Sequence, residues 1–138
     1  IGIFITLCLF VIAGCVTPRP QTDSRLTGTW QFDWDKTLQH YKRIGIAKHD
    51  AKIDFHHDSL TLRSITFEKE TVVFQFGNQE KKTCYYSVLG KTSRSTAILI
   101  KDSERDQGLI QLIEFENEGI WFSRDDARRT TWIFLRKE

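Results

Sequence analysis

The sequence has 138 residues, of which 40% are hydrophobic and 28% charged, a composition typical of one folded domain rather than a disordered chain. Its 20 basic and 18 acidic residues give a net charge of +2, which offers no support for a nucleic-acid-binding surface. Two of the 3 cysteines, Cys8 and Cys15, lie near the start, so Cys84 has no partner in the remainder. A disulfide framework and a thiolate zinc site are excluded for this reason.

Residues 1–14 form an apolar stretch without a charged residue, IGIFITLCLFVIAG. The stretch has the length of the apolar region of an export signal and is shorter than the ~20 residues that a membrane-spanning helix needs. An initiator Met and a positively charged start are missing ahead of it. We therefore interpret residues 1–14 as a truncated lipoprotein signal peptide. The alternatives are a buried apolar segment and an uncleaved membrane anchor.

Cys15 follows a branched apolar residue and two small residues, Ile12, Ala13 and Gly14. This pattern resembles the lipobox of bacterial lipoproteins, whose small side chains give a membrane peptidase access to the bond before the cysteine. The resemblance implies cleavage before Cys15 and a lipid on its thiol, and two or more acyl chains attach firmly to a membrane. Residues 15–25 would then be the lipidated cysteine and a polar, proline-containing tether.

Val16, directly after that cysteine, resembles the residue type that accompanies outer-membrane sorting in enteric-type bacteria. We therefore expect a lipid-anchored position in the cell envelope, facing the periplasm and on the outer membrane. The expected membrane contact is the N-terminal lipid.

Residues 26–138 contain recurring runs of β-forming residues separated by turn signals. Side chains alternate in character along these runs, and Val72, Phe74 and Phe76, for example, share one face. The pattern predicts an all-β domain, a small eight-stranded antiparallel up-and-down barrel. In the hairpin at residues 117–119, Gly119 is expected to supply a positive φ. The expected strands are residues 26–32, 60–68, 71–76, 83–89, 96–101, 109–116, 120–123 and 130–136.

One helix is predicted directly after the first strand, at residues 35–44. Asp33 or Asp35 can cap its first turn, and Gly45 can end it. Apolar residues recur at helical spacing and predict a buried stripe formed by Trp34, Leu38 and Tyr41, which can extend to Ile44. We expect this amphipathic helix to close one end of the barrel or to lie over its mouth. The apolar residues on both faces of residues 130–136 also indicate a strand covered on two sides, and the helix is a candidate for the outer cover.

Two short motifs in this domain resemble known barrels. Gly28, Thr29 and Trp30 resemble the Gly-x-Trp signature of lipocalins and fatty-acid-binding proteins, and residues 130–136 (TTWIFLR) are similar to the closing strand of such barrels. In those families an arginine of the last strand packs over the tryptophan of the first. The resemblance, which extends to small lipocalin-like bacterial lipoproteins, implies a barrel-closing cation–π pair of Trp30 and Arg136.

The sequence departs from these families in several ways. The domain is shorter than a full lipocalin, and no disulfide joins its ends. A second lid helix is not evident in residues 51–59, and no matched Arg–Tyr set for a carboxylate is present. A small eight-stranded barrel can also be filled by its own side chains.

Polar residues cluster before the second predicted strand, but we do not predict a metal site there. The adjacent His56 and His57 point to opposite sides if the segment is extended, and no helical His-x-x-x-His pair exists. We interpret the cluster as a solvated connection. Its members are His49, Asp50, Asp54, His56, His57 and Asp58.

The sequence contains no Gly-x-Ser-x-Gly, His-Glu-x-x-His or glycine-rich phosphate loop. Cys84 shares a strand face with Tyr86 and Val88, so we predict a packed core thiol rather than a nucleophile. We therefore predict no catalytic, metal-binding or cofactor-binding residues and do not expect an enzyme.

The 10 phenylalanines and 4 tryptophans suit either a packed core or an aromatic-lined cavity. The first hypothesis is a membrane-anchored envelope lipoprotein whose barrel binds a small apolar ligand or lipid. The alternative is a non-enzymatic interaction or assembly accessory of the envelope, with a filled barrel. Inhibition of an envelope hydrolase is a weaker third, because nothing marks an inhibitory loop. An empty apolar cavity above ~300 Å³ would favour the first hypothesis, and a filled core would favour the interaction module.

Overall fold

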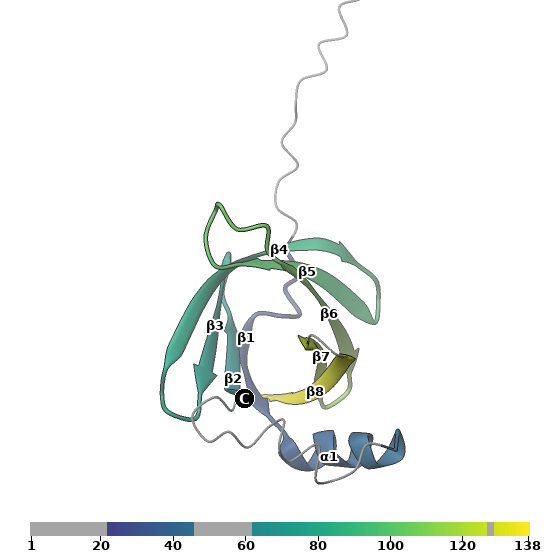
Figure 1. The fold of residues 1–138 in the computed structure, drawn as a ribbon. Helices are drawn as coiled ribbons and strands as arrows, with labels where there is room; N and C mark the ends of the chain where they lie inside the picture. The colour runs from purple at the N-terminus through teal and green to yellow at the C-terminus, as the bar shows by residue number, and fades with distance from the viewer. Residues whose placement is uncertain (1–21, 46–61, 127–128) are drawn as a thin grey trace, which may run out of the picture.

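The computed structural model describes residues 22–45, 62–126 and 129–138 (Figure 1). It confirms the predicted fold: antiparallel strands follow one another around a closed barrel, β8 pairs back with β1, and a helix follows the first strand. The elements are β1 (Gly28–Phe32), α1 (Trp34–Arg43), β2 (Leu62–Phe67), β3 (Thr71–Phe76), β4 (Lys81–Lys91), β5 (Ser95–Lys101), β6 (Leu109–Glu116), β7 (Gly119–Asp126) and β8 (Arg129–Lys137).

The alternation of side chains along each strand produces the barrel interior. On β4, Cys84, Tyr86 and Val88 are buried, whereas the intervening Tyr85 and Leu89 are exposed. A strand turns successive side chains to opposite faces, so one face of each strand supplies the core and the other faces outward. The apolar set of a strand therefore fixes which face is turned inward.

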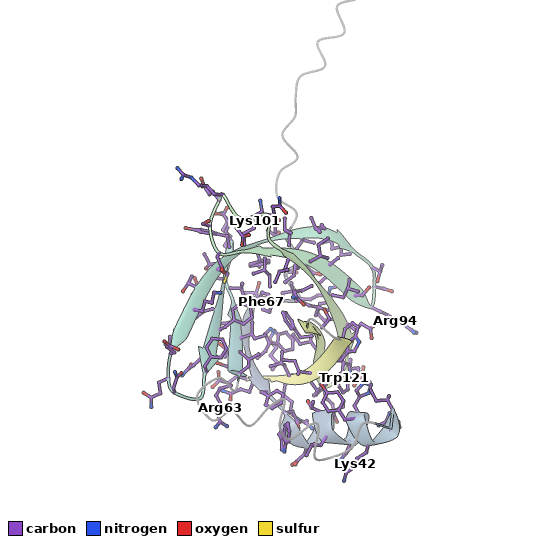
Figure 2. The ribbon with its side chains drawn as sticks, in the orientation of Figure 1. Lys42, Arg63, Phe67, Arg94, Lys101 and Trp121 are labelled. Atoms are coloured by element: carbon purple, nitrogen blue, oxygen red, sulfur yellow. The ribbon has the colours of Figure 1, made fainter. Side chains whose placement is uncertain are left out.

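One end of the barrel is closed by the turn that precedes β1. Leu26 is fully buried, and its carbonyl accepts a hydrogen bond of 2.8 Å from the indole N–H of Trp30. Phe67 packs edge-on against Tyr86 just inside this end, and Figure 2 shows Phe67 within the barrel. Arg25 bonds the carbonyl of Ser93 at 3.0 Å and so joins the turn to the loop between β4 and β5. We call this the closed end.

The helix begins where β1 leaves the sheet. Asp33 caps it, because its carboxylate accepts a hydrogen bond of 2.9 Å from the backbone N–H of Lys36. The backbone N–H of Asp33 donates to the carbonyl of Phe134, and the N–H of Phe134 donates to the hydroxyl of Thr37. The first turn of α1 therefore continues the pairing of β1 with β8. Gly45, at φ 82°, ends the helix as expected.

The helix covers the outside of the barrel and not its mouth, which corrects the expected position. The rings of His40 and Trp121 lie 4.8 Å apart, and the ammonium of Lys36 lies 3.9 Å from the ring centre of Phe134. Trp121 and Phe134 are paired neighbours on the outer face of β7 and β8. These two large rings need cover from water, and α1 supplies it.

The structure corrects the role expected of Gly119. Its φ is not positive, unlike that of Gly28 and Gly108, but the backbone of β8 passes very close to it. A Cβ at this position would lie 2.1 Å from the carbonyl oxygen of Leu135. Glycine is therefore required for close strand approach.

Gly119→Ala is expected to lower the free energy of unfolding by roughly 1–3 kcal/mol, because β7 and β8 must separate to admit the methyl group. Gly90→Ala is the matched control, since no heavy atom lies within 4 Å of a Cβ there. Urea unfolding followed by tryptophan fluorescence measures both variants. Equal losses at the two glycines would contradict this account of Gly119.

Asp33 supplies two stabilising interactions that variants can separate. Partial burial alone would raise its pKa, but the hydrogen bonds from the Lys36 amide and the Arg136 guanidinium lower the pKa overall below 3.8. Asp33→Asn keeps a capping oxygen and loses the ion pair, which is worth at most ~1 kcal/mol because Arg136 is half exposed. Asp33→Ala loses the cap as well, at a cost of ~0.5–2 kcal/mol.

The pH dependence of unfolding provides the corresponding measurement. Because the pKa is lowered in the folded state, the Asp33 contribution is present above about pH 3.8 and is lost as the pH falls through the folded value. Asp33→Asn is expected to remove this part of the acid-induced loss. An unchanged acid profile in that variant would show that Asp33 does not supply it.

Candidate ligand-binding cavity

A cavity of about 410 Å³ lies at the end of the barrel opposite the closed end. Five of its lining side chains are polar or titratable and five are apolar. The first group comprises Lys82, Cys84, Asp102, Asp106 and Gln111; the second comprises Phe74, Phe76, Ile100, Leu109 and Phe122. These residues come from the end of β3, the start of β4, the end of β5 with its following loop, the start of β6, and β7.

Two aromatic rings meet across the barrel interior. The ring centres of Phe74 on β3 and Phe122 on β7 lie 6.4 Å apart, at 71° to one another. These strands are not neighbours in the sheet, so the contact spans the inside of the barrel. Edge-to-face packing of this kind is favourable. Because both rings also line the cavity, they form an apolar partition between it and the residues packed deeper in the core.

A polar cluster occupies one wall. The thiol of Cys84 donates a hydrogen bond of 3.2 Å to the Asp102 carboxylate, which also accepts one of 3.1 Å from the ammonium of Lys82. Cys84 is 2% exposed. Burial, followed by its contact with the Asp102 carboxylate, raises the pKa of Cys84 to about 11. The thiol is therefore protonated at neutral pH, when the thiolate needed for nucleophilic chemistry is scarce.

The ion pair of Lys82 and Asp102 shifts the pKa values of both residues toward their charged forms. The hydrogen bond from Lys82 lowers the pKa of Asp102, and the contact with Asp102 raises the pKa of Lys82. Both groups are charged at neutral pH. They give the cavity a polar rim with one cation and one anion in direct contact.

The wall between β6 and β7 has an unusual hydrogen-bond pattern. Backbone pairing of these strands starts at Glu116↔Gly119 and ends at Ile113↔Phe122. Beyond that point the N–H of Leu112 donates to the Ser123 hydroxyl at 2.8 Å, and this hydroxyl donates to the Gln111 side-chain oxygen at 3.1 Å. A side chain therefore replaces the backbone ladder beside the cavity and fixes the amide of Gln111.

The expected pair of Trp30 and Arg136 is arranged differently. Arg136 bonds the carboxylate of Asp33 and lies 3.4 Å from that of Glu118. The cation over the ring of Trp30 is Lys137, whose ammonium is 5.4 Å from the ring centre. Neighbouring residues on a strand face opposite sides, so a shift of one position moves the expected arginine to the outside.

The other residues highlighted by the sequence fall into two groups. Cys84 lies in the cavity wall, as a buried thiol. Cys15 and the polar cluster within residues 46–61 lie outside the described residues. Sequence reasoning did not single out Lys82, Asp102, Gln111 or Phe122. The available signal was strand alternation, which turns Phe74 and Phe76 inward without showing that space remains between them.

In the described part of the chain, no helix is long and apolar enough to cross a membrane. The same residues contain no group of three side chains placed to hold a metal ion. Comparisons with protein-family models, curated proteins and solved structures found no match to this chain.

Asp102→Asn is expected to lower the pKa of Cys84, because it removes the carboxylate that disfavours the thiolate. Well below the pKa, each unit of decrease raises the thiolate fraction about tenfold. The rate of Cys84 alkylation by iodoacetamide, followed across pH by peptide mass spectrometry, should shift to lower pH. Glu104→Gln, in the same exposed loop, is the control. Superimposable profiles for Asp102→Asn and the unsubstituted protein would contradict the assigned cause.

Proposed function

We propose that this protein is a lipid-anchored envelope lipoprotein whose barrel binds a small ligand with an apolar body and a polar group. The observation that carries the proposal is the cavity of about 410 Å³, which has phenylalanine side chains in its wall and a charged pair at its rim. Small-molecule sites are typically concave, largely apolar and supplied with a few convergent polar groups. The space is open to solvent at the barrel end, above a packed core, so it favours a ligand that enters from that end.

The lining residues define the class of ligand. An apolar group fits among Phe74, Phe122 and Leu109, where burial of each CH₂ contributes ~0.8 kcal/mol. A polar group lies within the reach of Lys82 or Gln111, which can donate hydrogen bonds. The volume is at the lower end of the ~300–1,000 Å³ range of ligand sites, which favours a compact ligand or one short chain.

The lipid anchor is supported by the sequence alone. A short apolar leader, two small residues and Cys15 occur together, directly before a polar tether. The anchor would place the barrel at a membrane surface, which is itself a source of apolar ligands. Intact mass measurement of the protein extracted from its own membranes tests this part, because acyl chains on Cys15 add a defined mass.

Narrowing the mouth of the cavity tests the binding site. Leu109 lines the cavity and is 66% exposed, so Leu109→Trp adds bulk at the mouth with little effect on folding. The neighbouring Ile110 is 57% exposed and does not line the cavity, so Ile110→Trp is a matched control.

We expect saturable binding of a fluorescent anilinonaphthalene sulfonate to the folded protein, weakened about tenfold or more by Leu109→Trp, a loss of ~1.4 kcal/mol or more. Ile110→Trp should bind as the unsubstituted protein does. Native mass spectrometry of protein extracted from its own membranes should show a bound small molecule. Absence of saturable binding, or equal weakening by both tryptophans, would argue against a ligand in this cavity.

A further inference from the structure

Exposed apolar side chains gather on the outer face of three adjacent strands. Tyr85 and Leu89 come from β4, and Ile110 and Leu112 from β6, and all four are about half exposed. The partly exposed Leu99 of β5 lies between them, because the sheet register pairs Leu99 with Ile110. We call these five residues the β4–β6 face. Single exposed apolar residues are ordinary, but a contiguous group marks a contact surface.

The β4–β6 face is not covered by the helix. In Figure 1, β4 and β5 lie on the side of the barrel opposite α1, which packs on the outer rings of β7 and β8. Large apolar side chains on the outside of the barrel are therefore covered by a helix on one side and exposed on the other. Trp121 and Phe134 have a helix over them, whereas Ile110 and Leu112 are open to solvent.

The chain enters the barrel beside this face. The ammonium of Lys91, at the end of β4, bonds the carbonyl of Thr22 at 3.3 Å, and Arg25 bonds the carbonyl of Ser93. Seven residue steps separate Thr22 from Cys15. Even a fully extended chain of this length spans at most about 25 Å. An anchor at Cys15 would therefore keep the β4–β5 loop within about one barrel diameter of the bilayer.

The border of the face at the β4–β5 loop, next to the expected anchor, carries two basic residues that suit an anionic lipid surface. Lys91 and Arg94 lie at the β4–β5 loop, where Glu114 of β6 pairs with Ser95, and Lys101 lies at the far end of β5. The loop after β5, residues 102–108, has three acidic residues and one basic residue, so the basic charge lies at the β4–β5 end of the face and the other end is acidic. Basic residues next to a membrane of anionic lipids contribute ~1 kcal/mol each.

We propose that the β4–β6 face lies against the lipid bilayer and so turns the rim of the cavity at Leu109 toward the lipid. The inference rests on the anchor of the proposed function. Leu109 connects the two surfaces, because it is the residue before Ile110 of the face and also lines the cavity. The ligand class that follows is a membrane-derived amphiphile, which can pass from the bilayer to the cavity along apolar side chains.

Two labelled variants test this orientation. Leu112→Cys places a thiol on the face, and Ile44→Cys places one at the end of α1, at residues that are 48% and 55% exposed. Cys84 is buried and its pKa is raised to about 11, so labelling at neutral pH selects the introduced thiol. The full chain from its own membranes carries a nitrobenzoxadiazole label and is mixed with vesicles of phosphatidylethanolamine and phosphatidylglycerol.

With nitroxide-labelled lipid in the vesicles, we expect quenching of the label at position 112 to exceed that at position 44 several-fold. The label at 112 should also shift its emission to shorter wavelength only when vesicles are present. Equal quenching at both positions would overturn the orientation. A shift at 112 without vesicles that grows with protein concentration would overturn it in favour of a second copy of the chain.

Two further measurements on the same samples test the proposed function independently of the orientation. A Cys15 peptide without acyl chains would remove the anchor, and loss of saturable probe binding would remove the cavity ligand. In that case Cys8 and Cys15 are replaced by Ser in both labelled variants, so that the introduced thiol alone is labelled, and vesicles added to this unanchored protein still decide whether the β4–β6 face contacts lipid.

Discussion

Closure of the barrel depends on one short strand. β1 has five residues and must pair with β2 on one side and β8 on the other. Its pairing with β8 covers only three positions, from Trp30 to Phe32. Atoms outside the strand extend this seam, because the Asp33 amide bonds the carbonyl of Phe134 and the Glu138 amide bonds that of Thr29. A closed sheet leaves no unpaired edge, so these added contacts protect the barrel against edge-to-edge association.

The same strand makes the two ends of the barrel different. Where the chain enters β1, the turn carries Leu26 into the core and ties Trp30 to it. Where the chain leaves β1, it turns outward into α1 and contributes no side chain to the cavity wall. The closed end is therefore packed, while the opposite end keeps a volume bounded by Phe74, Phe122 and the polar cluster. Within the described residues, this asymmetry explains why the candidate site lies at the end opposite the turn.

Much of the fold could be predicted because strand alternation and helix capping are local signals. The alternating residues around Tyr86 predict a strand, and Asp33 predicts a helix start, each from only a few neighbouring residues. The position of α1 could be predicted only in part. Its amphipathic stripe shows that one helix face is buried but not which surface buries it, whereas the apolar residues on both faces of β8 indicate that its outer face needs cover. The sequence predicted a positive φ at Gly119, but glycine is needed there because β8 passes close to it. This contact with Leu135 joins two strands and can be seen only in the assembled sheet.

The candidate site was harder to predict for related reasons. A cavity is the space left after eight strands have packed, and no single segment encodes it. The contact of Phe74 with Phe122 joins residues 48 positions apart (122 − 74), across strands that are not neighbours. The cation over Trp30 shows how sensitive such inferences are, because one residue of register exchanges Arg136 for Lys137. Sequence patterns predict which face of each strand is turned inward. They do not predict which inward side chains meet or how much space remains between them.

The hydroxyl of Ser123 has a consequence for how such a barrel can change. Beside the cavity, the spacing of β6 and β7 is set by one side chain rather than by the main chain. Backbone hydrogen bonds between strands form with almost any side chain, so the strand spacing that they set survives substitution. The spacing that the Ser123 hydroxyl sets is lost when this residue is replaced. A substitution at Ser123 can therefore change the width of the gap between β6 and β7 beside the cavity, while the backbone-paired strands keep their spacing.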